Sequence, residues 1–235
     1  MRYDQIVDNL HQVQQRIADA AERADRDPAD VNLIAVSKTR SLDEIRAVVD
    51  AGVMDFGENY VQELEEKAEA LADLDVRWHA IGHLQTNKVR KITDFVALIH
   101  SVDSPRVGRE IDKRADAAGR RVPVLLQANV SGEESKFGVA EDEAFALAQD
   151  LVALQSARLV GLMTMPPYCE DPEGNRAHFV ELRTLRERLI DRGIPEACMR
   201  HLSMGMTCDF ETAVEEGATL VRVGTAIFGP RDYDS

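Results

Sequence analysis

The chain has 235 residues, of which 44% are apolar, and a formal net charge of −14. This length suits one large α/β domain or two small domains, and the apolar content is sufficient for a core. The acidic charge argues against nucleic acids and anionic membranes as general partners, although local donors could still bind a small anion.

The cysteines and the N-terminus indicate where the protein works. Cys169, Cys198 and Cys208 have no metal-like spacing, and an odd number of cysteines without a secretion signal suggests a reducing cytosol. Residues 1–5 are not a cationic segment followed by an apolar one, and no apolar stretch approaches the ~20 residues of a membrane helix. We therefore expect a cytoplasmic protein without a bound metal or a membrane partner.

An amphipathic helical pattern over residues 3–24 opens the chain, with apolar residues every three or four positions until Asp27-Pro28 ends it. Strand and helix patterns then alternate. We predict strands near residues 32–38, 54–58, 76–82, 95–101, 122–130, 157–165, 200–204 and 220–224. We predict helices over residues 41–51, 59–72, 85–93, 104–119, 141–155, 174–192 and 209–217.

Signals at the helix ends agree with these boundaries. Ser41 and Glu44 form a capping-box pattern at the start of one helix. Glycines follow four of the helical patterns, as helix-ending glycines do. They are Gly52, Gly119, Gly193 and Gly217.

Eight strands that alternate with helices predict a parallel sheet, and eight is the number that closes a TIM barrel. No linker, low-complexity stretch or change in composition divides the sequence. We therefore predict an α/β fold with a single TIM (β/α)8 barrel domain over residues 1–235 and an extra N-terminal helix. The alternative is an open, doubly wound sheet.

Lys38 stands at the end of the first predicted strand, where an apolar run gives way to a polar turn. A strand buried on both faces is a continuous apolar stretch, and a lysine at its end loses hydration, which disfavours its charged form. A neutral amine is what Schiff-base chemistry needs. The alternative is a lysine that keeps its charged head in solvent.

Two segments near the C-terminus have the residues of a phosphate site. In the first, a short apolar strand breaks into Ser203 and Gly205, and in the second, a strand ends at Gly224 and Thr225. Glycine lets the backbone approach an anion, hydroxyls donate hydrogen bonds, and helix N-termini offer N–H groups. Each motif is weak by itself because such turns are common.

A TIM barrel would bring these segments to Lys38. Its chemistry lies at the C-terminal ends of the strands, and phosphate often binds after strands seven and eight. Lys38 ends the first strand, which neighbours the eighth. A lysine beside a phosphate site is what pyridoxal 5′-phosphate (PLP) requires, because that cofactor carries an aldehyde and a phosphate. Arg222 shares a side of its strand with Gly224 and could hydrogen-bond the unprotonated pyridine nitrogen of PLP. The ring would then be a weak electron sink. The alternative is that Arg222 forms a charge pair inside the barrel.

Several motifs, taken together, resemble the pyridoxal-phosphate homeostasis protein family, whose fold resembles the N-terminal barrel of alanine racemase. They occur in order over nearly the whole chain. They are residues 35–39 (AVSKT), 56–63 (FGENYVQE), 78–88 (WHAIGHLQTNK), 129–138 (NVSGEESKFG), 161–165 (GLMTM), 202–206 (LSMGM) and 221–229 (VRVGTAIFG).

The resemblance implies that Lys38 forms the Schiff base with PLP and that Arg222 lies near the pyridine nitrogen. It implies that Asn59 and Met163 lie around the ring. It also implies a phosphate cup made partly of backbone N–H groups. The residues expected in this cup are Ser203, Gly205, Met206, Gly224 and Thr225.

The sequence departs from the family beside this cup. Thr207 and Cys208 stand where the family commonly has serine followed by a polar residue, so we expect no phosphate contact from the hydroxyl. Cys208 could be reactive at a helix N-terminus, but we expect a buried, inert thiol.

Three functions are compatible with a Schiff-base lysine beside a phosphate cup. The family is known for binding PLP and for influencing vitamin B6 balance, so the resemblance implies a carrier that releases PLP to PLP-dependent apoenzymes. An amino-acid racemase would need a second acid–base group, which alanine racemase takes from an additional domain; this chain ends at Ser235, just past the eighth strand. A Schiff-base aldolase would need acid–base partners beside the lysine. We favour the carrier, assign no catalytic residue, and expect a monomer or weak dimer.

Other polar residues have simpler interpretations. We expect His79 and His83 to be core or rim histidines, and residues 63–67 to be an exposed helical face. Residues 85–88 open a helix as either a solvated cap or a recognition element. Lys136 could receive or pass on the aldehyde, although a surface lysine is the simpler interpretation.

Overall fold

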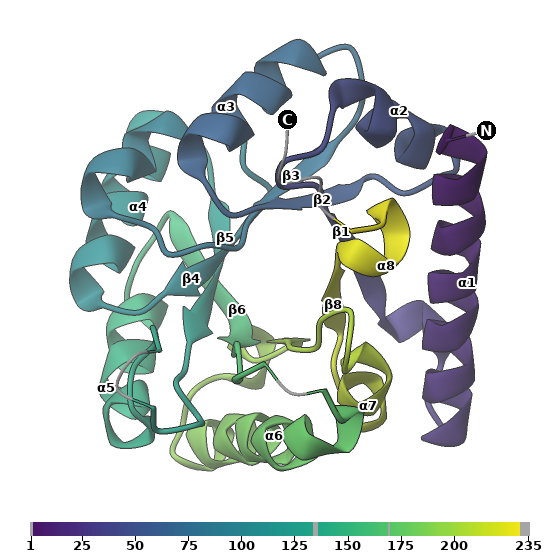
Figure 1. Ribbon diagram of the computed structural model, residues 1–235. Coiled ribbons are helices and arrows are strands. Elements are labelled where there is room, and N and C mark those ends of the chain that lie inside the picture. The colour runs from purple at the N-terminus through teal and green to yellow at the C-terminus, as the bar shows by residue number, and fades with distance from the viewer. Residues whose placement is uncertain (1, 134–135, 169, 231–235) are drawn as a thin grey trace.

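Each apolar segment predicted as a strand forms one in the computed structural model, which describes residues 2–133, 136–168 and 170–230. All neighbouring strands are parallel, and the first strand pairs with the eighth, so the sheet closes into a barrel (Figure 1). The TIM barrel is therefore confirmed, and the open sheet is wrong. The strands are β1 (Asn32–Val36), β2 (Asp55–Glu58), β3 (Arg77–Ala80), β4 (Leu98–Val102), β5 (Val122–Gln127), β6 (Ala157–Met163), β7 (His201–Ser203) and β8 (Leu220–Val223).

Helices surround the barrel, as the view along its axis in Figure 1 shows. The α-helices are α1 (Arg2–Arg23), α2 (Leu42–Asp50), α3 (Val61–Ala70), α4 (Pro105–Ala117), α5 (Glu141–Val152), α6 (Arg176–Asp191), α7 (Phe210–Glu215) and α8 (Thr225–Phe228). The 3₁₀ helices are η1 (Pro28–Asp30), η2 (Thr86–Lys91), η3 (Pro172–Asn175) and η4 (Glu196–Cys198). The helix predicted over residues 85–93 is instead the short 3₁₀ helix η2, and a helical turn, α8, replaces the turn expected after β8. The 3₁₀ helices η1 and η4 were not predicted.

The capping box and the helix-ending glycines predicted from the sequence are present in the structure. The capping box is present, with Glu44 accepting the backbone N–H of Ser41 at 2.8 Å and Ser41 accepting that of Glu44 at 3.3 Å. The four helix-ending glycines all have positive φ angles, between 64° and 99°. These short-range rules therefore fix where the chain turns back toward the next strand.

The N-terminal helix α1 packs its apolar face against α2, α7 and α8. The predicted helical stripe is buried as expected; its residues are Ile6, Leu10, Val13, Ile17 and Ala21. Burying each large side chain of this kind stabilises the fold by about 1.5–3 kcal/mol. Within the described part of the chain, no helix is long and apolar enough to cross a membrane.

Side chains inside the barrel divide into an apolar cluster and a polar one. Five buried residues form an apolar cluster separate from the core between strands and helices; they are Ile34, Leu98, Leu125, Met163 and Leu220. Toward the ends of the strands the interior becomes polar, with His100, Ser203 and Arg222 all buried. This polar interior leads to the mouth of the barrel. Cys169 and residues 134–135 of the fourth family motif lie outside the described residues.

Candidate cofactor-binding site at the mouth of the barrel

Lys38 lies in a tight turn directly after β1, at the C-terminal end of the barrel, and its side chain is half-buried. The backbone N–H of Arg40 closes the turn by donating to the carbonyl of Ser37 at 2.9 Å. Thr39 has a φ of +64°. Because this left-handed conformation is costly for a β-branched residue, neighbouring contacts must hold the turn.

Those contacts come from Lys67 in α3. Its ammonium donates to the Ser37 carbonyl at 2.6 Å, and to the carboxylates of Glu58 and Glu63 at 2.7 Å each. Glu63 also accepts the backbone N–H of Thr39 at 2.5 Å. All three ammonium hydrogens therefore have acceptors, and the contacts secure the backbone on both sides of the lysine turn.

The burial of Lys67 corrects the expectation of an exposed helical face over residues 63–67. Lys67 turns inward because three acceptors surround its ammonium. Burial raises the pKa of Glu58, although the charge of Lys67 opposes this shift. Glu58 Oε2 has no hydrogen-bond partner among the described residues, so Lys67 and Ser37 provide the compensation for this buried carboxylate through its other oxygen.

Arg222 projects into the barrel from β8 and is 4% exposed. Its Nη2 donates to the carbonyl of Thr164 at 2.9 Å, and its Nη1 donates to the hydroxyl of Ser203. Both partners are neutral, so these contacts do not form the charge pair considered as an alternative. Burial lowers the pKa of Arg222 to about 10, with Asp209 opposing this shift. The guanidinium is therefore charged at neutral pH and has N–H groups left for a ligand.

The two glycine segments meet at the ends of β7 and β8, where the backbone N–H of Arg222 donates to the carbonyl of Gly205 at 3.0 Å. Gly205 has a φ of +89°, and a Cβ there would lie 2.5 Å from the Cβ of Ala213 in α7. A Cβ on Gly224 would lie 3.1 Å from the carbonyl oxygen of Val36. The positive φ and the first close approach favour glycine at position 205, and the second approach places the Gly224 segment directly beside β1.

Free backbone donors line this region. Among the described residues, the N–H groups of Gly205, Gly224 and Thr225 have no hydrogen-bond acceptor. Gly224 and Thr225 begin the helical turn α8, whose free N–H groups are suited to an anion. The geometry thus fits the phosphate cup that the sequence predicts.

Asp209 organises the loop after β7, although the sequence did not identify it as a site residue. It is 3% exposed, and it accepts the backbone N–H of Met206 at 2.6 Å and the amide of Asn175 at 2.8 Å. The N–H of Met206 is therefore occupied, and a cofactor would contact Met206 through other atoms. An aspartate at the start of a helix is too common to signal this role.

Thr207 and Cys208 follow in the same loop. The Thr207 hydroxyl accepts the backbone N–H of Ala226 at 3.5 Å, which joins the two glycine segments. Cys208 is exposed, so the expectation of a buried thiol is wrong. The turn over residues 207–209 carries Cys208 to the rim while Asp209 points inward.

Asn59 and Met163 also lie at strand ends. Asn59 directly follows β2, and its carbonyl oxygen lies 2.2 Å from where a Cβ on Gly82 would be, so the ends of β2 and β3 approach closely. Met163 ends β6, is 1% exposed, and is in register with Ser203. Both residues therefore belong to the end of the barrel that holds Lys38.

A row of hydrogen-bonded side chains extends from Arg222 into the barrel. Nδ1 of His100 lies 2.9 Å from the Oγ of Ser203, and Nε2 of His100 lies 3.0 Å from Nδ1 of His79. Nε2 of His79 lies 2.9 Å from Oδ1 of Asp55. The structure confirms the expectation that His79 is buried, whereas His100 and Asp55 were not identified from the sequence.

Burial and neighbouring charges determine the ionisation of His100 and Asp55. Burial, together with His79 and Arg222, lowers the pKa of His100 well below its usual value, so its ring is neutral. Burial alone would raise the pKa of Asp55, but hydrogen bonds from Arg77 and His79 lower it to about 2. A carboxylate therefore ends the row at neutral pH.

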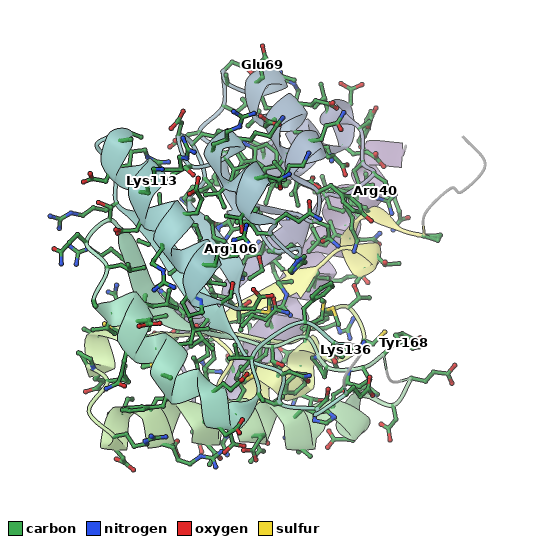
Figure 2. The ribbon with its side chains drawn as sticks, turned by 90° about the vertical axis from the view of Figure 1, so that its left-hand side faces the viewer. Arg40, Glu69, Arg106, Lys113, Lys136 and Tyr168 are labelled. Carbon is green, nitrogen blue, oxygen red and sulfur yellow. The ribbon has the colours of Figure 1, made fainter. Side chains whose placement is uncertain are left out.

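The rim of the barrel carries two residues, His83 and Lys136, whose roles the sequence did not decide. His83 stacks on Phe137 with ring centroids 4.0 Å apart, and its Nδ1 lies 3.3 Å from Asp103. Lys136 is half-buried. The side view in Figure 2 shows Lys136 and Arg40 toward the end where the strands terminate. His83 is thus a rim histidine, as expected.

Comparison with known proteins agrees with this geometry. Residues 8–232 match the family model described as "Alanine racemase, N-terminal domain". Together with the closed barrel and the lysine after β1, this match defines the class: an alanine-racemase-type barrel.

A pyridoxal phosphate homeostasis protein from Aquifex aeolicus is 45% identical over 226 residues, covering 96% of this chain and 98% of the relative. A relative of the same name from Pseudomonas aeruginosa is 44% identical, covering 97% of this chain and 96% of the relative. The structure of PipY from Synechococcus elongatus PCC7942 with PLP bound has a TM-score of 0.83 and 36% identity, covering 95% of this chain and 100% of that one. This chain belongs to the pyridoxal phosphate homeostasis protein family.

Proposed function

We propose that this protein binds PLP as a Schiff base on Lys38 and takes part in intracellular PLP homeostasis without strong catalytic turnover. One observation carries the proposal: β1, which leads to Lys38, lies directly beside the Gly224 segment of the cup. A single ligand that is an aldehyde at one end and a phosphate at the other therefore fits both. The names of the relatives and the PLP bound to PipY support this assignment.

Different residues bind the aldehyde, the ring and the phosphate of PLP. Lys38 supplies the amine, and its condensation with the aldehyde forms the imine and releases one water. Asn59 and Met163 flank the ring. The cup binds the phosphate through Ser203, Gly205, Met206, Gly224 and Thr225, and Gly205, Gly224 and Thr225 have the free N–H groups.

Arg222 determines what the bound cofactor can do. PLP supplies an aldehyde and a ring that withdraws electrons most strongly when its nitrogen is protonated. Arg222 has only N–H donors and stays charged, so it hydrogen-bonds the nitrogen in its unprotonated form. This weaker electron sink favours holding the cofactor over turning over amino acids.

We propose further that PLP-dependent apoenzymes accept the cofactor, and that the protein is a cytoplasmic monomer or weak dimer. The acidic charge of −14 keeps it soluble and away from anionic surfaces. We also propose that residues 1–235 form one domain. Size-exclusion chromatography with light scattering tests the oligomeric state.

The decisive experiment is an absorbance titration of purified protein with PLP. Wild type and Lys113→Ala, which changes an exposed lysine near the opposite end of the barrel, should show the Schiff-base band (Figure 2). Lys38→Ala should lose this band. No band in wild type with excess PLP would overturn the proposal. Racemase and transaminase assays on the same sample should show negligible turnover, and rapid turnover would favour a racemase.

A further inference from the structure

We propose that Asp55, His79 and His100 are positioning residues for Arg222, acting through a chain of hydrogen bonds that all point the same way along the barrel. This inference rests on the proposed function, because Arg222 matters most where it meets the pyridine nitrogen. We name the row Asp55–His79–His100–Ser203–Arg222 the axial chain.

The donor and acceptor roles follow from the carboxylate end. Asp55 is ionised and can only accept, so Nε2 of His79 carries the hydrogen in their 2.9 Å contact. In the proposed arrangement Nδ1 of His79 accepts, and Nε2 of His100 donates in the 3.0 Å contact. Since His100 is neutral, its Nδ1 accepts.

The same roles follow from the arginine end. A guanidinium only donates, so the Oγ of Ser203 accepts from Arg222. The single hydroxyl hydrogen of Ser203 is then free to point to Nδ1 of His100, 2.9 Å away. Both ends are therefore consistent with the proposed arrangement, with hydrogen on Nε2 of both histidines and on neither Nδ1.

This arrangement explains why Arg222 has one orientation. Ser203 Oγ holds one terminal nitrogen and the Thr164 carbonyl holds the other, so two contacts fix the planar group. His100 and Ser203 are fully buried, and water cannot replace a lost partner easily. Loss of the acceptor at His100 would leave the Ser203 hydrogen without a partner and its hydroxyl free to rotate, which would loosen the contact with Arg222.

The arrangement also redefines Ser203. In the proposed arrangement its only hydrogen points to His100, so its hydroxyl has none to donate to a phosphate, which corrects the expected place of this hydroxyl in the phosphate cup. Ser203 would thus serve the site by holding Arg222, and the phosphate would depend on the backbone donors of Gly205, Gly224 and Thr225.

The far end of the axial chain lies at the opposite end of the barrel. Asp55 begins β2 and accepts two hydrogen bonds from Arg77, which begins β3 and whose side chain is 56% exposed. Asp55, at the N-terminal end of the barrel strands, therefore influences the orientation of Arg222 near the opposite end.

The direct test measures the histidine tautomers in the full-length protein without added cofactor. Long-range ¹H–¹⁵N NMR at pH 7 should show both His79 and His100 with a protonated Nε2 and a bare Nδ1. A hydrogen on Nδ1 of either ring, or a charged His100, would overturn the proposal. This result does not depend on whether PLP binds, so it separates failure of the axial chain from failure of the proposed function.

A variant test measures the consequence for the site. His100→Phe keeps a ring but removes the acceptor, and we expect the PLP dissociation constant to rise about tenfold while the Schiff-base band still forms. The NMR signals of the Arg222 side chain should shift as well. His201→Phe is the matched control, because His201 is a half-buried histidine that contacts Thr219 instead of the axial chain. Unchanged affinity and unchanged Arg222 signals in a folded His100→Phe protein would refute the positioning role.

Discussion

Two lysine–glutamate pairs in this protein have nearly the same length but very different environments. Lys67 lies 2.7 Å from Glu58 with both side chains buried, whereas Lys91 lies 2.6 Å from Glu65 with both side chains partly exposed. Removing one member of a buried pair costs about 3–5 kcal/mol, because it leaves the other charge uncompensated. An exposed pair contributes at most about 1 kcal/mol.

We therefore expect Lys67→Met to lower the free energy of unfolding by about 3–5 kcal/mol, and Lys91→Met by less than about 1 kcal/mol. For a chain of this size, the larger loss lowers the Tm by roughly 10 °C. Urea and thermal unfolding of both variants measure the difference. Equal losses would refute the view that burial makes the Lys67 pair important.

A second variant checks the cause of the loss. Adding Glu58→Gln to Lys67→Met removes the uncompensated carboxylate, so part of the stability should return. Burial already raises the pKa of Glu58, and loss of Lys67 removes a charge that opposes this shift. A folded-state pKa above the unfolded value means that stability falls as pH rises through it, so the deficit of Lys67→Met should be larger at pH 8 than at pH 5. A deficit independent of pH would contradict this account.

Three further predictions concern backbone, pH and capping. Gly205→Ala should destabilise the fold by about 2–4 kcal/mol and weaken PLP binding, because the new Cβ would lie 2.5 Å from the Cβ of Ala213. Gly52→Ala has open space around it and should cost only about 1 kcal/mol, and urea unfolding of both variants measures the difference. Asp55 has a pKa of about 2, below its ordinary value of 3.8, so its carboxylate contributes about 2 kcal/mol to the free energy of unfolding above pH 4. This contribution is lost as the pH falls toward 2, so the stability difference between wild type and Asp55→Asn should shrink over that range. Ser41→Ala removes the capping box and should cost about 0.5–2 kcal/mol, and a Tm unchanged from wild type would contradict this role.

The features predicted correctly from the sequence depend on local rules. The eight strands follow from apolar runs, the helix ends from capping residues and glycines, and the inward direction of Arg222 from the two-residue period of a strand. Placing Lys38 beside Gly224 needed one further rule, that the first and last strands of a barrel are neighbours. These predictions required no knowledge of side-chain contacts.

The features that the sequence did not predict depend on contacts between separate segments. Lys67 lies in a stretch of charged residues typical of an exposed face, and only the Ser37 carbonyl and Glu58, from other elements, make its burial favourable. The pairing of His79 with His100 depends on strand register and side-chain direction in β3 and β4. Cys208 was misplaced because the turn that carries it outward is set by Asp209. Such arrangements leave no periodic signal in one sequence.

The closing contacts of the barrel have a consequence for its folding. Strand β1 pairs with β8, and α1 packs against α7 and α8, so the beginning of the chain meets its end. Contacts this distant in sequence form slowly, because a long loop must close before they contribute. The Gly224 segment reaches the end of β1, just before Lys38, only when these strands pair, so a partly synthesised chain has the amine of Lys38 but not the proposed phosphate cup. Under the proposed function, the ability to retain PLP during synthesis therefore arises only after β8 has emerged from the ribosome.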